Sequence, residues 1–126
     1  MRAEMARHKP AAGPLDVKLL PGGLVDLEFA LHARQLLHHD GFDPNLGRAV
    51  ERMVAAGLAP ADLPAAYRLL ARLLITMRLV APDAAEPAEA TRVLIARAVG
   101  CDDWAHMVAE MAVARQEVAT WWETIA

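Results

Sequence analysis

Several features that mark particular classes of protein are missing from this chain. Its one cysteine, Cys101, cannot form an internal disulfide, which excludes a disulfide-stabilised secreted scaffold and favours a reducing compartment. No apolar run approaches the roughly 18 residues that a membrane span needs, and the first residues lack a signal-peptide pattern. We therefore expect a cytoplasmic protein with no membrane partner.

Catalytic and charge signatures are equally scarce. No Ser-His-Asp order, Walker loop or cysteine pair occurs, so the chain shows no complete catalytic set of its own. The formal net charge of −3 gives no general electrostatic reason to bind nucleic acid. What the chain does have is 56% hydrophobic residues over 126 positions, which suits one domain with a substantial core.

Proline, glycine and aspartate divide the chain into helical segments. Residues 1–14 have the pattern of the end of an upstream helix or linker, stopped at Pro10, and residues 15–126 that of a helical domain. Asp43 is expected to cap the second helix, and Gly41 to end the first in a left-handed conformation. The pattern predicts an all-α bundle of about five helices with a short N-terminal extended arm, the helices lying near 24–39, 44–56, 61–80, 86–100 and 102–125.

The arm is predicted from a short alternating pattern. Leu15, Val17 and Leu19 alternate with Asp16 and Lys18, as in a strand with one apolar face. The chain offers no second convincing strand, and a lone strand leaves its backbone groups unpaired. The segment would therefore dock on a neighbouring domain or lie as an extended arm on the helices.

The last helix carries one long apolar stripe at spacings of mostly three, four and seven residues. Core packing is the favoured interpretation and a methionine-lined partner groove the alternative. The stripe consists of Trp104, Met107, Val108, Met111, Val118, Trp121 and Ile125.

The first helix combines a polar stripe with one misplaced charge. Helical geometry places Glu28, His32, Gln35 and His39 in one sector, which would face water, a cleft or another domain. Asp26 falls on an apolar side instead, where an unpartnered charge is costly. Either Asp26 accepts from the backbone N–H of an N-cap residue Gly23, or it reaches toward a nucleotide site.

Three hypotheses of ligand binding apply to this region: a chelated ion, a phosphate and a transition metal. Asp26 and Glu28 point about 200° apart on a helix, so they cannot chelate one ion as a pair. Gly22 and Gly23 would let the backbone approach a phosphate, but the two carboxylates in the following turn would repel it. Glu28 and His32 have metal-ligand spacing, yet no further ligand joins them, so we expect no bound metal.

In the third helix, Arg68 and Arg72 share a face and are either snorkelling surface residues or a site for an anion or a protein.

The run from Asp16 to Phe29, DVKLLPGGLVDLEF, resembles the segment that follows the nucleotidyltransferase core in the glutamine synthetase adenylyltransferase family. There a lysine and a Gly-Gly pair precede an acidic residue, a spacer, Glu and Phe. The resemblance continues through Asp43-Pro-Asn, Ala66-Tyr-Arg and Asp103-Trp, and so covers most of the chain. One departure is Leu20-Pro21, where many relatives carry a basic residue.

The resemblance implies the C-terminal helical domain of a large bifunctional enzyme that attaches AMP to a tyrosine of glutamine synthetase and removes it by phosphorolysis. Its catalytic signature, a Gly-Ser turn with paired aspartates that bind Mg²⁺, is absent from these 126 residues. The chain alone is therefore expected to be inactive, with ATP and Mg²⁺ bound by the full-length enzyme. The motif residues that the resemblance carries over are Lys18, Gly22, Gly23, Asp26, Glu28 and Phe29.

Three functional hypotheses follow. In the leading one, the arm and first helix buttress the active site of an upstream nucleotidyltransferase domain, with Lys18, Asp26 and Glu28 as the key residues. In the second, the bundle docks glutamine synthetase or a PII-type signal protein through its polar stripe, without an active-site role. The third, a self-contained small enzyme, is disfavoured by the missing catalytic set.

Overall fold

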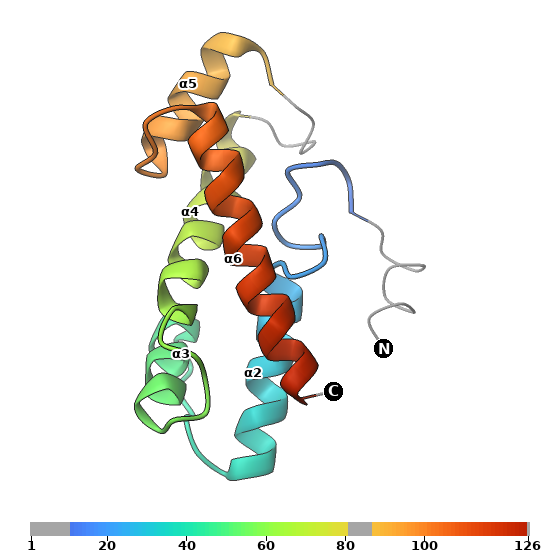
Figure 1. Cartoon of the computed structure of the whole chain (residues 1–126), viewed down its shortest axis with the longest axis vertical. Coiled ribbons are helices and arrows are strands. Elements are labelled where there is room, and N and C mark those ends of the chain that lie inside the picture. Colours follow the sequence, from blue (N-terminus) through green and yellow to red (C-terminus); the bar gives the residue numbers. More distant parts are fainter. Residues whose placement is uncertain (1–10, 81–86, 126) are drawn as a thin grey trace.

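The computed structural model describes residues 11–80 and 87–125. These residues form five helices and no strand: α2 (Leu24–His38), α3 (Leu46–Ala55), α4 (Leu63–Val80), α5 (Glu89–Ala98) and α6 (Trp104–Ile125) (Figure 1). Over the described residues, the expected all-α bundle is confirmed. The predicted helix end before Pro10 and the helix start at Glu86 lie outside the described residues.

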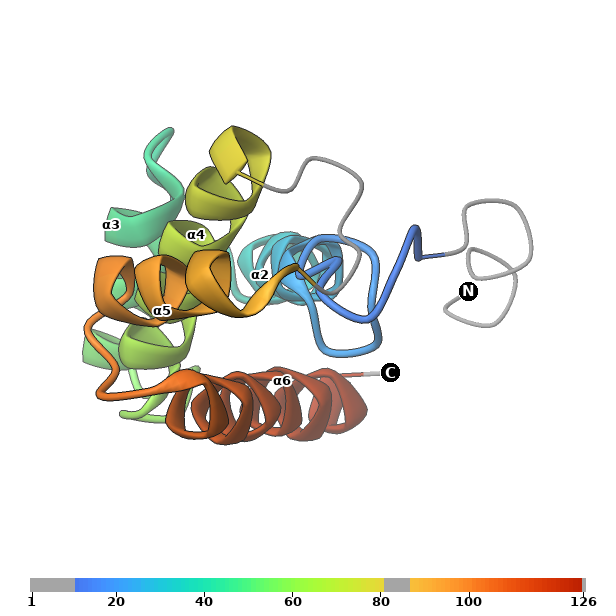
Figure 2. The same cartoon turned by 90° about the horizontal axis from the view of Figure 1, so that it is seen from above.

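The two longest helices form the centre of the bundle. α4 packs mainly on α6, and α6 also packs along α2. Seen from above, α6 crosses one side of the other helices, and α3 and α5 lie beside α4 (Figure 2). Burial of each large aliphatic side chain contributes about 1.5–3 kcal/mol, so the core between these helices stabilises the fold. The largest fully buried side chains are Leu27, Leu31, Met53, Leu63, Leu70, Leu73, Ile95, Met107, Val17, Val50 and Val118.

The predicted stripe of α6 faces this core. Met107, Met111, Val118 and Trp121 are buried, as the core interpretation requires. Trp121 also donates its indole N–H to the Leu58 carbonyl at 3.1 Å, which ties α6 to the connection between α3 and α4. Trp104 and Ile125 are partly buried against the core. The prediction is wrong for Val108, which is 44% exposed because it lies one helical step away from Met107.

Two helix ends differ from their predicted residues. α2 ends at His38, and its C-cap residue His39 has a φ of 53°, which makes it the left-handed residue; the His39 N–H donates to the Gln35 carbonyl at 2.8 Å. Gly41 also has a positive φ, but it lies two residues beyond. α3 is capped by Asn45, whose side chain accepts from the Arg48 N–H at 3.0 Å.

Asp43 supports the start of α3 from outside the helix, although it is not the cap. Its carboxylate accepts from the Asn45 N–H at 2.9 Å and lies 3.5 Å from the Arg48 guanidinium and 3.2 Å from that of Arg52. The Asn45 N–H lowers the pKa of Asp43 most, and the two arginines lower it further against an opposing effect of burial.

The predicted strand is wrong: the segment preceding α2 folds as a series of turns. The Asp16 carboxylate accepts from the backbone N–H groups of Ala12, Lys18 and Leu19 at 2.9, 3.2 and 3.1 Å. Aspartate stabilises turns through such side-chain to backbone bonds, and here they compete with an extended chain. Two of the three alternating aliphatics, Leu15 and Val17, are still buried in the core of the bundle, and Leu19 is partly exposed.

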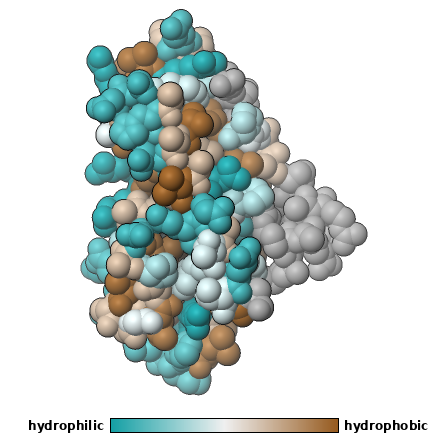
Figure 3. All heavy atoms as spheres, viewed as in Figure 1, coloured by the Kyte–Doolittle hydropathy of each residue, from teal (hydrophilic) through white to brown (hydrophobic). Residues whose placement is uncertain are grey.

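The surface mixes hydrophilic and hydrophobic residues on the face shown in Figure 3. In the described part of the chain, no helix combines the length and the hydropathy needed to cross a membrane.

Cys101 is buried, and burial raises the pKa of its thiol, with a further rise caused by the nearby carboxylates of Glu110, Asp102 and Asp103.

Candidate functional site

The Pro-Gly-Gly turn packs directly against the backbone of α6. Gly22 has a φ of +74°, a left-handed conformation that glycine adopts without strain. A Cβ on Gly22 would overlap the backbone carbonyl of Arg115, whose guanidinium donates to the Pro21 carbonyl at 2.9 Å. A Cβ on Gly23 would likewise overlap the carbonyl of Val17. Close packing of backbone on backbone therefore accounts for both glycines.

The N-terminus of α2 is already covered by the turn that precedes it. The N–H groups of Gly23, Leu24 and Val25 donate to the carbonyls of residues 20, 17 and 18 at 2.8, 2.8 and 3.1 Å. A phosphate cradle requires N–H groups that point at the ligand. Because these three point at the chain's own carbonyls, the geometry argues against direct phosphate binding here.

Asp26 is buried and holds the turn from inside. It is 5% exposed, and its Oδ2 accepts from the Gly22 N–H at 2.8 Å. The bond is of the expected capping kind, but its donor lies one residue before the predicted Gly23, whose N–H is taken by the Leu20 carbonyl. The Asp26 carboxylate thereby fixes the path of the backbone between the arm and α2.

The structure brings Lys18 and Glu28 together on one surface. Both line a groove of about 260 Å³ between α2 and α4, together with Tyr67 and Arg78 of α4. Sequence reasoning missed these last two residues, since only the packing of α2 on α4 places them there. Asp26 is not in this groove. Apolar side chains form the rest of the lining: Leu24, Val25, Leu46, Ala71, Leu74 and Ile75.

The predicted polar stripe of α2 is divided between surface and interior. Glu28 and His32 are both about half exposed and lie 3.8 Å apart. Gln35 is buried, donates to the Gly41 carbonyl at 3.0 Å and contacts His32 Nδ1 at 3.0 Å. Gln35 thus supports the connection to α3, and the other three stripe residues, Glu28, His32 and His39, are exposed.

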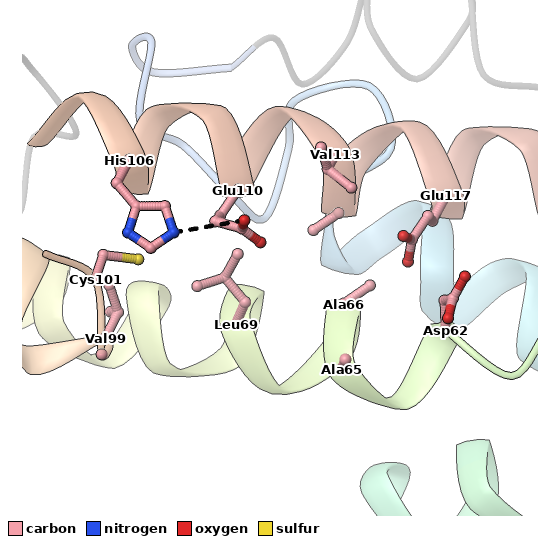
Figure 4. A pocket seen from close by; sticks show the side chains of 12 residues that line it. Asp62, Ala65, Ala66, Leu69, Val99, Cys101, His106, Glu110, Val113 and Glu117 are labelled. Atoms are coloured by element: carbon pink, nitrogen blue, oxygen red, sulfur yellow. Dashed lines mark ion pairs between the residues drawn. The ribbon is translucent and has the colours of Figure 1, made fainter.

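A larger groove, of about 430 Å³, lies between α4 and α6 (Figure 4). Ala65, Ala66 and Leu69 line it from α4, opposite Val113 of α6. Three carboxylates lie along it, from Asp62, Glu110 and Glu117. Sequence analysis did not predict this groove, because its two walls are about fifty residues apart in the chain.

The titratable groups of this groove influence one another. Burial raises the pKa of Glu117, and the Asp62 and Glu110 carboxylates raise it further. His106 Nε2 lies 3.6 Å from Glu110 Oε1, the contact drawn in Figure 4, and its Nδ1 accepts from the Asp102 N–H at 3.1 Å. Within residues 11–80 and 87–125, no three His, Cys, Asp or Glu side chains converge to hold a metal ion.

A family model and one relative each match nearly the whole chain, and a second relative matches part of it. The family model described as GlnD PII-uridylyltransferase matches residues 1–125. A bifunctional glutamine synthetase adenylyltransferase/adenylyl-removing enzyme from Caulobacter vibrioides is 36% identical over 99% of this chain. The enzyme of the same description from Mesorhizobium japonicum is 36% identical over 63% of it.

These relatives are much longer than the chain. The matched segments span 14% of the Caulobacter protein and 9% of the Mesorhizobium protein. No solved structure matches the chain. The family model and the relatives carry different names, but both names describe transfer of a nucleotidyl group to or from a protein.

Proposed function

Because this chain belongs to the GlnD PII-uridylyltransferase family and is similar along nearly all its length to a bifunctional glutamine synthetase adenylyltransferase, we propose that it is a helical domain supporting the active site of such an enzyme. AMP transfer from ATP to glutamine synthetase takes place on a nucleotidyltransferase domain elsewhere in that enzyme. The 126 residues alone turn over no nucleotide.

The observation that carries this proposal is the joint placement of Lys18 and Glu28. They lie on opposite sides of the Pro-Gly-Gly turn and line the same groove, and both are exposed. The turn is held by the buried Asp26 and by contact with the α6 backbone, so the position of Lys18 relative to α2 is fixed. A rigid element that presents one cation and one carboxylate is suited to orient groups of an adjoining catalytic site.

The residues described here do not suit a magnesium site. Hydrated Mg²⁺ is bound through carboxylates that face the ion, usually with the substrate phosphates. Asp26 is bonded to the Gly22 N–H, and Glu28 lies against His32, on a different side of α2. The Mg²⁺ and ATP of the proposed reaction therefore belong to the catalytic domain, and this chain contributes support to that site.

Substitution in the full-length enzyme tests the proposal. Glu28→Gln and Lys18→Ala each lower the rate of AMP transfer to glutamine synthetase by about tenfold or more, equivalent to about 1.4 kcal/mol of transition-state stabilisation. Thermal unfolding of these variants is unchanged, because both side chains are exposed. Asp26→Ala lowers both transfer and thermal stability, since it leaves the buried Gly22 N–H without its acceptor.

Glu123→Gln, an exposed substitution on α6 outside the groove, serves as the matched control and leaves the transfer rate unchanged. Wild-type transfer rates for both Glu28→Gln and Lys18→Ala would reject the active-site role and leave Asp26 as a purely structural residue. A PII-type signal protein as a further partner is tested separately, by titrating it into the full-length enzyme with and without these substitutions.

A further inference from the structure

The outward face of α4 is unusual for a solvent-facing helix surface. Its exposed side chains include two large aliphatic residues, Ile75 at 61% and Leu79 at 79% exposure. Three exposed arginines surround them, Arg68, Arg72 and Arg78. In chain order these residues follow one another at spacings of four, three, three and one, so all of them lie on one side of α4. Together these five residues form the arginine face.

The cations of this face have no anionic partner within the described chain. None of its three arginines forms an ion pair with another described residue. Arg48 and Arg52 of α3, by contrast, are both within 3.5 Å of the Asp43 carboxylate. The net charge of the chain is −3, so the positive charge of the arginine face is a local concentration and not a property of the whole surface.

The arginine face continues into the groove between α2 and α4. Ile75 and Arg78 line that groove, and Lys18 adds a fourth cation at its edge. At the other end of the arginine face, Arg68 lines a second hollow together with Asn45 and Tyr67, at the start of α3. From residue 68 to residue 79 the helix rises by about 16 Å. A surface of this length is larger than a single phosphate needs and suits a polypeptide.

We propose that the arginine face docks an acidic segment of the protein substrate, with an apolar side chain of that segment seated against Ile75 and Leu79. The inference rests on the proposed function, in which the substrate is glutamine synthetase, the protein that the relatives' names specify. Charge complementarity selects the partner: unpaired arginines attract carboxylates, and the aliphatics between them require an apolar contact. Arginine is also enriched among the residues that dominate protein interfaces.

Three members of the face, Arg68, Arg72 and Leu79, lie outside the groove of the residues proposed to support catalysis, whereas Ile75 and Arg78 line it. Lys18 and Glu28 share their groove with the later part of α4, whereas Arg68 and Arg72 lie nearer the start of that helix, and Arg68 lines a hollow with residues of α3. The catalytic domain and the protein substrate can therefore contact this bundle at the same time. Binding at the arginine face contributes equally to the ground state and the transition state, so its loss raises KM without lowering kcat.

The test is a charge reversal in the full-length enzyme, Arg68→Glu with Arg72→Glu. The KM for glutamine synthetase rises by about tenfold or more, while kcat at saturating glutamine synthetase and the KM for ATP stay unchanged. Raising the ionic strength increases the wild-type KM, and this salt dependence is weaker in the variant. Arg97→Glu, an exposed reversal on α5, is the matched control and leaves the KM for glutamine synthetase unchanged.

A second variant, Leu79→Asn, removes an apolar contact outside the Lys18–Glu28 groove without changing charge and raises the same KM. An unchanged KM in both variants overturns the docking proposal, and so does a loss confined to kcat. The two proposals can be rejected independently. If AMP transfer depends on Glu28 but not on Arg68 and Arg72, the supporting role is retained and the docking face is rejected. Circular dichroism melting checks that both variants are folded.

Discussion

At the scale of single residues, Gly22 is the position where substitution has the clearest expected cost. Gly22→Ala places a Cβ against the Arg115 carbonyl and forces alanine into a left-handed conformation. The conformation alone costs about 1–2 kcal/mol, and the clash moves the arm away from α6 at further cost. We expect the free energy of unfolding to fall by at least about 2 kcal/mol in urea titrations.

Gly100 provides a matched control for this prediction. Its φ is +80°, and a Cβ built there would meet no atom within 4 Å. Gly100→Ala should therefore lose only the conformational part, about 1–2 kcal/mol. Equal losses at Gly22 and Gly100 would show that contact with α6 is not what requires glycine at the turn.

The same turn shows what a residue pattern can and cannot predict. The sequence identified Asp26 as a carboxylate on an apolar side of α2, because helical angles follow directly from spacing. Its donor was predicted one residue too late, since the Gly23 N–H is taken by Leu20 in a turn that periodicity does not describe. From the sequence alone, both glycines allowed a phosphate interpretation, whereas Gly22 accommodates the carbonyl of the distant Arg115 and Gly23 the carbonyl of the nearby Val17.

At the scale of elements, the capping of α3 gives a local prediction. Asn45→Ala removes the acceptor of the Arg48 N–H and should destabilise the domain by about 1 kcal/mol. Asn45→Asp keeps an acceptor oxygen at that position and should cost little, with an added benefit from negative charge at a helix N-terminus. Urea unfolding of the two variants compares them directly, and equal losses would argue that the Asn45 cap has no energetic role.

Helix number and order were predictable because proline, glycine and aspartate interrupt helices by local chemistry. The exact ends were not: α3 begins after Asn45 because Asp43 is bonded to the Asn45 N–H and to arginines of the next turns. The arm was mispredicted for a related reason. An alternating pattern specifies which side chains are buried, and Leu15 and Val17 are indeed buried, but it does not require a strand when Asp16 can bond the backbone of a turn.

At the scale of the whole molecule, the grooves depend on helix packing and could not be read from spacing. Lys18 and Glu28 were predicted as site residues, but their common groove with Tyr67 and Arg78 exists only because α2 packs on α4. Arg68 and Arg72 were predicted to share a face. Exposed aliphatic side chains lie on the same face because another side of α4 packs against the core, and this orientation depends on tertiary contacts.

The α4–α6 groove leads to a prediction about pH. Glu110 and Glu117 lie on α6, and folding brings the distant Asp62 to the same groove. The pKa of Glu117 is raised above its ordinary value of 4.5, mainly by burial and also by the other two carboxylates. The folded state therefore binds this proton more tightly than the unfolded state does. The resulting stabilisation is fully present below the unfolded pKa and is lost as pH rises through the folded pKa.

Glu117→Gln removes this loss because glutamine does not ionise. We expect the variant to be more stable than wild type at pH 7.5, by about a few tenths of a kcal/mol, and this advantage to shrink or vanish at pH 4. Urea unfolding at both pH values measures the difference, with the exposed Glu123→Gln on the same helix as control. A variant that is less stable than wild type at pH 7.5 would mean that the ionised Glu117 has a favourable partner, and that burial and repulsion by Asp62 and Glu110 do not destabilise its charged form.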